Sequence, residues 1–342
     1  MRTKYSHINI NINARIPFRS STGVGRYFRN IMLHMPKKGS INFNLIYPKA
    51  PVLKFGLGGH LWDQFRFFSL RNFNTWLPTH AGSLFSRNYY VTIHDLQPIL
   101  FPQYFNFFFV LWYKMSVSIH VAKSKKIFVV SNFIKKMLEQ NYSKSRGKII
   151  VHWNGYEHLK GIKLRTLPVE KNYAVILGTV SKHKLSIRNI RIWLNSEKNT
   201  YFLYIIGSVS IDEREEFIEL LKKNSQLIHL ENLRDEEIFY VLKNSSYLLF
   251  ISPFEGFGIP ALEAVFYHIP VIYPNDSAID EILCGYGIGV NAFDSNQISE
   301  AIHSIKRINV KSEKYISLRK RILHNYSWKT SAKIIFDNLT ND

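Results

Sequence analysis

Hydrophobic and polar positions follow two patterns that alternate along the chain. Short apolar runs typical of buried strands recur, and most are followed by a loop and then by apolar residues at helical spacing. Ile8–Ile12 alternates apolar and polar residues, as a strand does. The clearest apolar runs are Tyr89–Ile93, Ile127–Val130, Lys148–His152, Tyr173–Leu177, Phe202–Ile206, Leu227–Leu230, Tyr247–Ile251 and Ile269–Tyr273. This alternation predicts an α/β protein built from doubly wound parallel sheets with helices on both faces.

With 342 residues, the chain is longer than one hydrophobic core usually supports, so we expect two domains. Residues 157–169 show little periodicity and contain Pro168, which indicates a linker. Pro and Gly repeatedly interrupt residues 39–90, where only a short helix near Leu61 is predicted. The expected division is a first domain at residues 1–160, a linker at 161–172, a second domain at 173–324 and a terminal helix at 325–342.

The stretch Ser252–Ala264 has the form of a strand end, a glycine loop and a helix start. Gly256 and Gly258 let the backbone approach a ligand, and the free N–H groups of the helix start favour an anion such as a pyrophosphate. The carboxylate of Glu263, about one turn inside the helix, can accept hydrogen bonds from a sugar diol. The simpler alternative is a tight turn in which Glu255 and Glu263 are both solvated.

The spacing of these two glutamates resembles the E-x7-E signature of retaining glycosyltransferases of family 4. The resemblance implies the GT-B fold, in which two Rossmann-like domains face a cleft and the C-terminal helix crosses back to the first domain. It also implies a donor nucleotide on the second domain and an acceptor on the first. In this arrangement Glu255 contacts the donor sugar hydroxyls, Glu263 contacts the ribose, and the amides of Gly256, Phe257 and Gly258 bind the diphosphate.

A second glycine loop, Ser20–Tyr27, follows the first predicted strand and precedes apolar residues at helical spacing. Taken alone, such a string is often an ordinary turn between a strand and a helix. It resembles the TGxGRY-like string of the same family, which lies at the mouth of the first domain. The resemblance implies that Gly23 and Gly25 lie near the donor phosphates and the acceptor.

The strand Tyr89–Ile93 ends in His94 and Asp95. Open α/β sheets place ligands at the carboxyl ends of their strands, and a neutral imidazole there can donate to a sugar hydroxyl or a phosphate oxygen. The alternative is a histidine that satisfies buried backbone groups. The strings Val91–Leu96 and Phe101–Phe105 resemble the His-Asp segment of the mannosyltransferase-like branch, which implies that His94 contacts the sugar ring.

A basic loop follows the first strand of the second half. Family 4 members commonly carry Arg-Lys-Asn or Arg-Lys-Gly in this loop, whereas here His183 replaces the arginine, Lys184 matches, and Leu185 replaces the small or polar residue. The resemblance implies that Thr179 and Lys184 contact the diphosphate. A fixed ammonium group stabilises the negative charge on a departing nucleoside diphosphate. A free surface lysine is the alternative, and Arg188 is the substitute cation if the loop is rearranged.

The net charge of +20, from 45 basic and 25 acidic residues, indicates a polyanionic partner, either an anionic membrane surface or a nucleic acid. The basic residues are dispersed and no nucleic-acid-binding module is recognisable, so we expect no nucleic acid partner. The apolar run Tyr104–Tyr113, followed by lysines, suits a helix in the lipid headgroup region, although a core helix fits equally well. No run reaches the ~20 apolar residues of a membrane span, and no signal peptide is recognised. We expect a cytoplasmic protein, peripheral on the inner face of the cytoplasmic membrane.

Three further features concern disulfides, metal ions and the terminal helix. Cys284 is the one cysteine, which excludes an intramolecular disulfide and a multi-cysteine zinc site, and we expect its thiol to be buried. No Asp-x-Asp triplet is present to hold a divalent metal under a pyrophosphate, so we expect a metal-independent enzyme without a cofactor. Trp328 opens the terminal helix and is expected to be a packing anchor.

Together these features predict a retaining glycosyltransferase that moves a sugar onto a lipid-linked oligosaccharide for a bacterial surface polysaccharide, either O-antigen or capsule. GDP-mannose is the first candidate donor, because the His94 and Ser20–Tyr27 strings resemble the mannosyltransferase branch, and UDP- or dTDP-sugars are the other candidates. A non-catalytic GT-B subunit that supports a partner transferase is one alternative, which the substitutions His183 and Leu185 leave open. A basic nucleic-acid-binding protein is the other.

Overall fold

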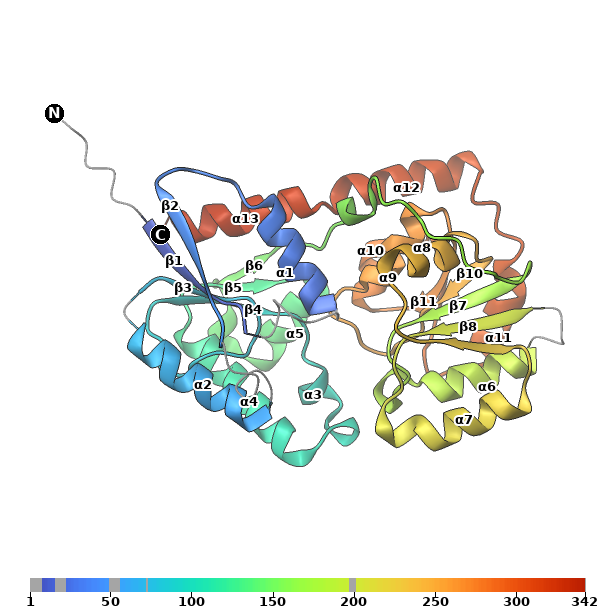
Figure 1. Ribbon diagram of the computed structural model, residues 1–342, viewed down its shortest axis with the longest axis horizontal. Coiled ribbons are helices and arrows are strands. Elements are labelled where there is room, and N and C mark those ends of the chain that lie inside the picture. Colours follow the sequence, from blue (N-terminus) through green and yellow to red (C-terminus); the bar gives the residue numbers. More distant parts are fainter. Residues whose placement is uncertain (1–7, 16–22, 49–55, 72, 197–200, 342) are drawn as a thin grey trace. The chain divides into compact units, whose positions relative to one another are not determined.

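The computed structural model describes residues 8–15, 23–48, 56–71, 73–196 and 201–341 (Figure 1). The chain divides into two compact units, one containing residues 1–155 and 327–342 and the other residues 156–326. Each unit is an α/β domain with a parallel sheet, as predicted. The limits of the linker, 161–172, stay a prediction, and the structure has no helix or strand from Lys160 through Asn172.

The first unit contains a six-stranded parallel sheet with the strand order β2-β1-β3-β4-β5-β6. Its strands are β1 (Ile8–Asn13), β2 (Ile41–Ile46), β3 (Thr75–Leu77), β4 (Tyr89–Ile93), β5 (Ile127–Val129) and β6 (Ile149–Val151). Its helices are α1 (Gly23–His34), α2 (Gly56–Ser69), α3 (Gln97–Leu100), α4 (Phe107–Lys123), α5 (Asn132–Asn141) and α13 (Trp328–Thr340). The order reverses between β1 and β3, which is the point where open sheets of this kind bind ligands.

The terminal helix α13 packs against α1 of the first unit. Trp328 is fully buried at its start, with its ring 6.3 Å from that of Tyr27, so the predicted packing anchor is confirmed. The helix begins where the hydroxyl oxygen of Ser327 accepts a hydrogen bond from the amide of Thr330. Further along, the hydroxyl of Ser331 donates to the carbonyl of Trp153. The last helix is therefore part of the first unit's core.

The second unit contains a six-stranded parallel sheet with the strand order β12-β11-β10-β7-β8-β9. Its strands are β7 (Tyr173–Leu177), β8 (Phe202–Ile206), β9 (Leu227–Leu230), β10 (Tyr247–Leu249), β11 (Val271–Pro274) and β12 (Gly287–Val290). Its helices are α6 (Ser186–Ser196), α7 (Arg214–Lys223), α8 (Asp235–Lys243), α9 (Ile259–Phe266), α10 (Ala278–Leu283), α11 (Ser295–Ile305) and α12 (Glu313–Asn325).

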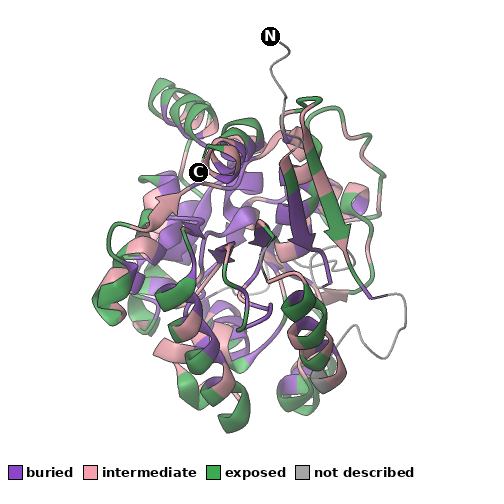
Figure 2. Ribbon diagram, turned by 90° about the vertical axis from the view of Figure 1, so that its left-hand side faces the viewer, coloured by how far each residue is buried: buried purple, intermediate pink, exposed green. Residues whose placement is uncertain are grey.

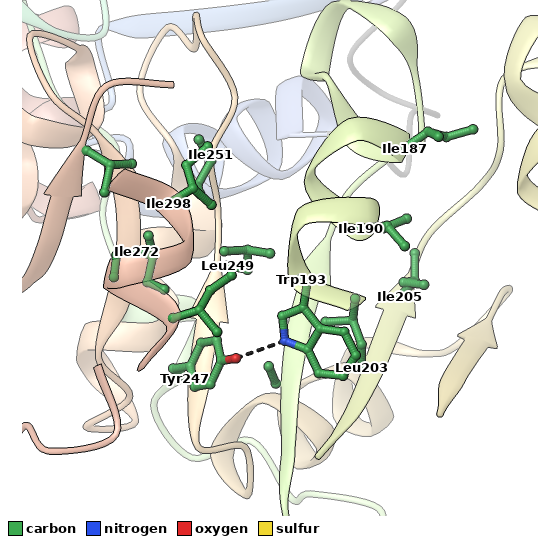
Figure 3. Close-up of a cluster of buried hydrophobic side chains, with 14 of the residues drawn as sticks. Ile187, Ile190, Trp193, Leu203, Ile205, Tyr247, Leu249, Ile251, Ile272 and Ile298 are labelled. Carbon is green, nitrogen blue, oxygen red and sulfur yellow. Dashed lines mark hydrogen bonds between the residues drawn. The ribbon is translucent and has the colours of Figure 1, made fainter. Parts of the chain in front are cut away.

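A cluster of buried aliphatic and aromatic side chains fixes α6 and α11 on this sheet (Figure 3). At its centre the indole N–H of Trp193, on α6, donates to the hydroxyl of Tyr247, on β10, over 2.8 Å. A buried indole needs such a partner, because an unpaired donor loses its bond to water on folding. The cluster also includes Leu249 and Ile251. It therefore holds the carboxyl end of β10 beside β7, where the candidate site lies.

Burial follows the predicted layering, since the strands are largely buried and the helices carry exposed outer faces (Figure 2). Two expectations differ from the structure. Cys284 is exposed, not buried, because it is the left-handed cap residue that ends α10. The helix expected near Leu61 begins earlier, at Gly56, and spans 14 residues. The helix α4 buries Val110 and Val117, as a core helix does, while Phe107 and Phe108 are more than 70% exposed. Its position in a lipid headgroup region stays a prediction.

Candidate active site

The candidate site of the second unit lies where its strand order reverses. The chain runs from β7 outward to β9 and then returns to β10, so β7 and β10 are neighbours whose following loops diverge. Such a switch point leaves room for a ligand at the carboxyl ends of the two strands. The loop after β7 carries Thr179 and Lys184, and the loop after β10 carries Glu255.

The glycine loop Ser252–Gly258 ends in a residue that requires glycine. Gly258 caps α9 with φ 96° and ψ 56°, the left-handed region that side chains disfavour. A Cβ atom there would lie 2.9 Å from Cγ1 of Ile279, which is too close for an ordinary contact. The loop therefore enters α9 by a turn that brings its backbone against α10, and Pro260 occupies the first turn of the helix, a position that suits proline.

We expect Gly258→Ala to lower the free energy of unfolding by about 2–4 kcal/mol, because it adds steric overlap to an unfavourable backbone angle. Gly285→Ala is the matched control, since Gly285 has φ 91° but no described atom within 4 Å of the position that a methyl group would take. That control is expected to lose only about 1–2 kcal/mol. Urea unfolding of both variants measures the difference. Equal losses would show that the contact with Ile279 has no energetic consequence.

Lys184 and Glu255 form an ion pair across the switch point. The Nζ atom of Lys184 lies 2.8 Å from Oε1 of Glu255, and the two side chains are 24% and 20% exposed. Lys184 ends a short 3-10 helix, Lys182–Lys184, that directly precedes α6. Two predicted residues, 71 positions apart in the chain, are therefore brought together.

Lys184, the cation of this pair, lines a small pocket of about 30 Å³. Its lining comes from the ends of β7 and β10 and from the start of α6: Ile176, Leu177, Gly178, Thr179, Lys184, Ser186, Asn189, Leu249, Phe250, Ile251 and Ser252. A pocket of this volume has room for a few water-sized groups and is far smaller than a typical ligand pocket. With Lys184 bound to Glu255, the pocket accommodates only small polar groups.

The backbone of the basic loop shows why Gly or Asn is common in the family string where this chain has Leu185. Leu185 has φ 53° and ψ 33°, a left-handed conformation in which Gly or Asn is favoured over Leu. Thr179, also predicted, is exposed and its hydroxyl lies 3.3 Å from that of Ser208. Arg188, the substitute cation, is bound elsewhere, because its guanidinium donates to the carbonyls of Ala292 and Phe293. Lys184 is therefore the basic residue of this loop that faces the glycine loop.

Glu263 occupies a different environment from the one predicted. It is 1% exposed, and its Oε1 accepts a hydrogen bond from Nε2 of His158 over 2.9 Å. His158 lies in the short 3-10 helix Glu157–Leu159, 105 residues earlier in the chain. The carboxylate that was expected to face a ribose therefore also anchors the segment before β7. The ribose contact itself stays a prediction.

The remaining glycine-loop residues are buried. Phe257 is 3% exposed and its ring packs edge-on against Tyr326, with the centroids 5.7 Å apart. Its side chain is thus a core residue, and only its amide is suited to a ligand. Gly256 is also buried. The diphosphate contacts predicted for the amides of Gly256, Phe257 and Gly258 stay predictions.

In the first unit, His94 lies at the carboxyl end of β4, as expected. Burial lowers the pKa of His94 to about 4, and its ring packs edge-on against Tyr27 with the centroids 4.6 Å apart. Its Nε2 donates to the carbonyl oxygen of Pro78 over 2.8 Å. Because a neutral imidazole carries one proton, Nδ1 is an acceptor. The expectation that His94 donates to a sugar is therefore corrected: the Nε2 proton is used by Pro78, and Nδ1 can accept from a hydroxyl.

The glycines of the first loop open α1. Gly23 is its first residue and is exposed, whereas Gly25 is buried one position after Val24. The preceding part of the predicted string, residues 20–22, lies outside the described residues. At the end of β1, Asn13 and the nearby Arg15 both bond the buried carboxylate of Asp63 on α2. Neither the Asp63 cluster nor His158 was predicted, because nothing in the local sequence distinguishes such residues.

The comparisons with known proteins identify the second unit. Residues 162–322 match the family described as glycosyl transferases group 1. These residues are a glycosyl transferases group 1 domain. The chain is also similar to the O-antigen chain mannosyltransferase RfbU of Salmonella typhimurium, at 25% identity over 237 residues, which cover 67% of this chain and 64% of that protein.

Solved structures show the fold of the whole chain. Sucrose-phosphate synthase from Thermosynechococcus elongatus aligns with a TM-score of 0.76 at 13% identity, and the alignment covers 98% of both chains. HepE of Anabaena, solved in complex with UDP-glucose, aligns with a TM-score of 0.73 at 14% identity over 98% of this chain and 100% of that one. The chain therefore has the GT-B fold, with the group 1 domain as its second unit.

Within the group 1 domain, the structure brings Thr179, Lys184 and Glu255 together at the switch point of the sheet. His94, Gly23 and Gly25 belong to the first unit, so their approach to this group stays a prediction. No group of three His, Cys, Asp or Glu side chains suited to a metal ion occurs among the described residues. Within the same residues, no helix is long and apolar enough to cross a membrane.

Proposed function

We propose that the chain is a retaining, metal-independent glycosyltransferase that uses a nucleotide-sugar donor. The observation that carries the proposal is the ion pair of Lys184 and Glu255 beside the pocket at the switch point of a group 1 domain. A cation and a carboxylate held at this point match the two demands of a nucleotide sugar, which presents a diphosphate and a sugar with several hydroxyls.

In this proposal the donor separates Lys184 from Glu255 and contacts each of them in turn. A bound diphosphate attracts the ammonium group of Lys184, and Glu255 is then released to accept hydrogen bonds from the sugar hydroxyls. As the bond from sugar to phosphate breaks, negative charge builds on the nucleoside diphosphate, and the fixed ammonium stabilises that charge in the transition state. We name no protein nucleophile. His94 contributes Nδ1 as an acceptor for a hydroxyl of the sugar.

For the donor sugar we propose mannose from GDP-mannose, and for the acceptor a lipid-linked oligosaccharide of a bacterial O-antigen or capsule. The similarity to a protein named as an O-antigen chain mannosyltransferase supports both. UDP- and dTDP-sugars are the alternative donors, since HepE was solved with UDP-glucose. Exposed aromatic residues at the start of α4, Phe107 and Phe108, support a peripheral position on the inner face of the cytoplasmic membrane, where such an acceptor is held.

A donor screen tests this proposal. Thermal unfolding is measured with GDP-mannose, UDP-glucose and a dTDP-sugar at equal concentrations, and one of them is expected to raise the midpoint, because a ligand that binds only the folded state stabilises it. The stabilising donor, labelled in its sugar, is then incubated with a lipid extract that contains candidate acceptors. Absence of stabilisation by every nucleotide sugar would contradict the proposal.

Glu255→Ala is expected to abolish transfer to the lipid extract while leaving the thermal midpoint within a few degrees of the unsubstituted protein. The carboxylate is the group proposed to hold the sugar hydroxyls, and only its side chain is removed. Glu300→Ala, at an exposed position of α11, is the matched control and should transfer sugar at the normal rate. Full transfer by a folded Glu255→Ala protein would rule out the role of Glu255.

A further inference from the structure

A second pocket lies in the first unit, at the edge of the sheet opposite to His94. It has a volume of about 560 Å³, within the range of ligand pockets, and is lined by Phe68, Arg71, Phe85, Ser86, Arg87 and Lys123. Three of these six side chains carry a positive charge and none is acidic. Arg71 precedes β3, Arg87 precedes β4, and Lys123 ends the helix before β5, so all three cations lie at the amino edge of a parallel sheet.

Backbone and ring contacts connect the residues of this pocket. The amide of Arg87 donates to the carbonyl of Arg71 over 3.2 Å, and Nζ of Lys123 donates to the carbonyl of Leu84 over 3.3 Å. The guanidinium of Arg71 lies over the ring of Phe68, 4.4 Å from its centroid. The ring of Phe68 in turn contacts that of Phe85 edge-on, with the centroids 6.0 Å apart. Charge and aromatic surface are thus combined in one fixed pocket.

Two hydrogen-bond donors of the pocket have no acceptor among the described residues. Ser86 is 3% exposed, and its buried Oγ has no partner there; the buried Nε of Arg71 also has none. An unpaired buried donor destabilises the folded protein, so an anion that accepts from either group would be favoured here. Arginine side chains suit phosphate oxygens in particular, because their planar N–H groups match its geometry.

An exposed apolar stripe leads away from this pocket along α2. Leu61, Phe65 and Phe68 recur at helical spacing, and they are 48%, 75% and 47% exposed. The helices α2 and α4 lie side by side, since the rings of His60 and Trp112 are 5.3 Å apart (Figure 1). Both of these neighbouring helices therefore carry exposed apolar side chains. A ligand that fills the pocket with an anion can lay an apolar portion along this stripe.

We propose that this pocket binds the phosphate group of an anionic membrane lipid. Arg71, Arg87, Lys123 and Ser86 hold the phosphate, and Phe65 and Phe68 contact the acyl chains or the interface beside it. The proposal rests on the membrane association proposed above and names the surface that makes it. It requires neither donor nor acceptor, and the pocket lies at the opposite edge of the sheet from His94.

Vesicle binding is measured without any sugar donor. A negative result would therefore contradict the lipid site and leave the transferase assignment unaffected. The protein is sedimented with phosphatidylcholine vesicles that contain about 30% phosphatidylglycerol, an experimental choice that makes the vesicle surface anionic. Binding to these vesicles, and much weaker binding to pure phosphatidylcholine, is expected. Arg87→Gln combined with Lys123→Gln should weaken binding about 30-fold, since two basic groups at an anionic surface are lost.

A control pair separates the pocket from general attraction. Lys136→Gln combined with Lys144→Gln removes the same charge from exposed positions elsewhere in the first unit, and should weaken binding by less than about threefold. Ser86→Ala changes no charge and removes the unpaired hydroxyl, so it should weaken binding about tenfold, as expected for a hydrogen bond to a charged group. Equal losses in both pairs together with normal binding by Ser86→Ala would overturn the proposal.

Further experiments test the apolar stripe and distinguish a lipid from other anionic ligands. Phe65→Ser should weaken vesicle binding about tenfold, because the apolar stripe no longer enters the interface. Thermal stabilisation by inorganic phosphate that depends on Ser86, without sedimentation on anionic vesicles, would show a site for free phosphate and contradict a lipid. Displacement of the protein from vesicles by single-stranded DNA or RNA, lost in Arg87→Gln combined with Lys123→Gln, would assign the pocket to nucleic acid and overturn the proposal.

Discussion

Lys184→Met is expected to lower kcat/KM for sugar transfer by about 10²- to 10³-fold, the loss typical when one group that stabilises transition-state charge is removed. The ammonium of Lys184 lies 2.8 Å from Glu255 and borders the pocket at the switch point of the sheet. Methionine keeps most of the side-chain volume and removes the charge. The loss should fall on kcat as well as on KM, because negative charge on the leaving diphosphate increases as the bond breaks.

Lys182→Met is the matched control for this prediction. Lys182 belongs to the same 3-10 helix, is exposed, and does not line the pocket, so its replacement should leave kcat/KM within about twofold. Steady-state kinetics with the donor identified by the thermal screen, combined with thermal midpoints of both variants, provide the measurement. If Lys184→Met transfers sugar as fast as Lys182→Met, the ammonium group has no part in the reaction.

The double variant Lys184→Met with Glu255→Gln shows whether the two residues act as a unit. Residues that share one interaction give non-additive losses. In the proposed donor complex Lys184 contacts the diphosphate and Glu255 contacts the sugar hydroxyls, so we expect the two losses in kcat/KM to multiply in the double variant. A double variant that is little worse than the poorer single variant would indicate that the two residues act only as an ion pair.

The elements of the fold were predictable where a local pattern is sufficient. Apolar runs such as Tyr173–Leu177 and Ile127–Val129 are strands. Ser131, of a residue type that commonly caps helices, begins α5 by accepting from the amide of Ile134. The glycine loop before α9 was also predictable, since Gly258 has the positive φ that favours glycine and Pro260 follows it. In these places the residue type itself reports the backbone conformation.

Contacts between distant segments were not predictable in the same way. The bond from His158 to Glu263 joins residues 105 positions apart, and neither residue carries a local signal of it. The acceptor of the His94 proton, Pro78, lies on another loop, so the sequence predicted the position of the imidazole but not the direction of its remaining hydrogen bond. Such details depend on how strands are ordered in the sheet.

The apolar stripe proposed to contact lipid, Leu61, Phe65 and Phe68 on α2, could not be predicted from the sequence either. Residues 39–90 are interrupted by Gly and Pro, and their pattern predicted little, yet they contain α2 with its apolar stripe. An apolar residue in a helix is normally assigned to the core, because sequence alone does not show which face has a neighbour. Phe65 at 75% exposed and Phe67 at 0% are two positions apart and have opposite environments. Only the packing of the sheet distinguishes them.

Acidification from pH 7 to pH 5 is expected to destabilise the first unit by several kcal/mol. Two of its histidines, His120 and His152, are fully buried, and burial lowers the pKa of His120 to about 4 and that of His152 to about 3. The nearby charge of Lys123 lowers the pKa of His120 further. Both side chains have neutral partners, since His120 bonds the hydroxyl of Tyr89 and His152 lies 3.3 Å from the hydroxyl of Tyr27.

The sign follows from where the protons bind. The unfolded chain takes up a proton at each histidine near pH 6.5, whereas the folded protein takes it up only near pH 3 to 4. Between these values the unfolded state binds more protons, so the free energy of unfolding falls as the pH falls. At pH 5 each histidine contributes a loss of about 2 kcal/mol, which for the pair is a large part of the ~5–15 kcal/mol that stabilises a typical domain.

Urea unfolding between pH 7.5 and pH 4.5 measures the effect, and hydrogen exchange of the amides in β4, β5 and α4 assigns it to the first unit. His120→Gln and His152→Gln should each lower the slope of stability against pH, since each removes one proton that only the unfolded state binds at pH 5. His324→Gln, on the exposed surface of α12, is the matched control and should leave those amides unchanged. A free energy of unfolding that stays constant down to pH 5 would mean that both imidazoles accept protons inside the folded unit, and their burial would then have no consequence for stability.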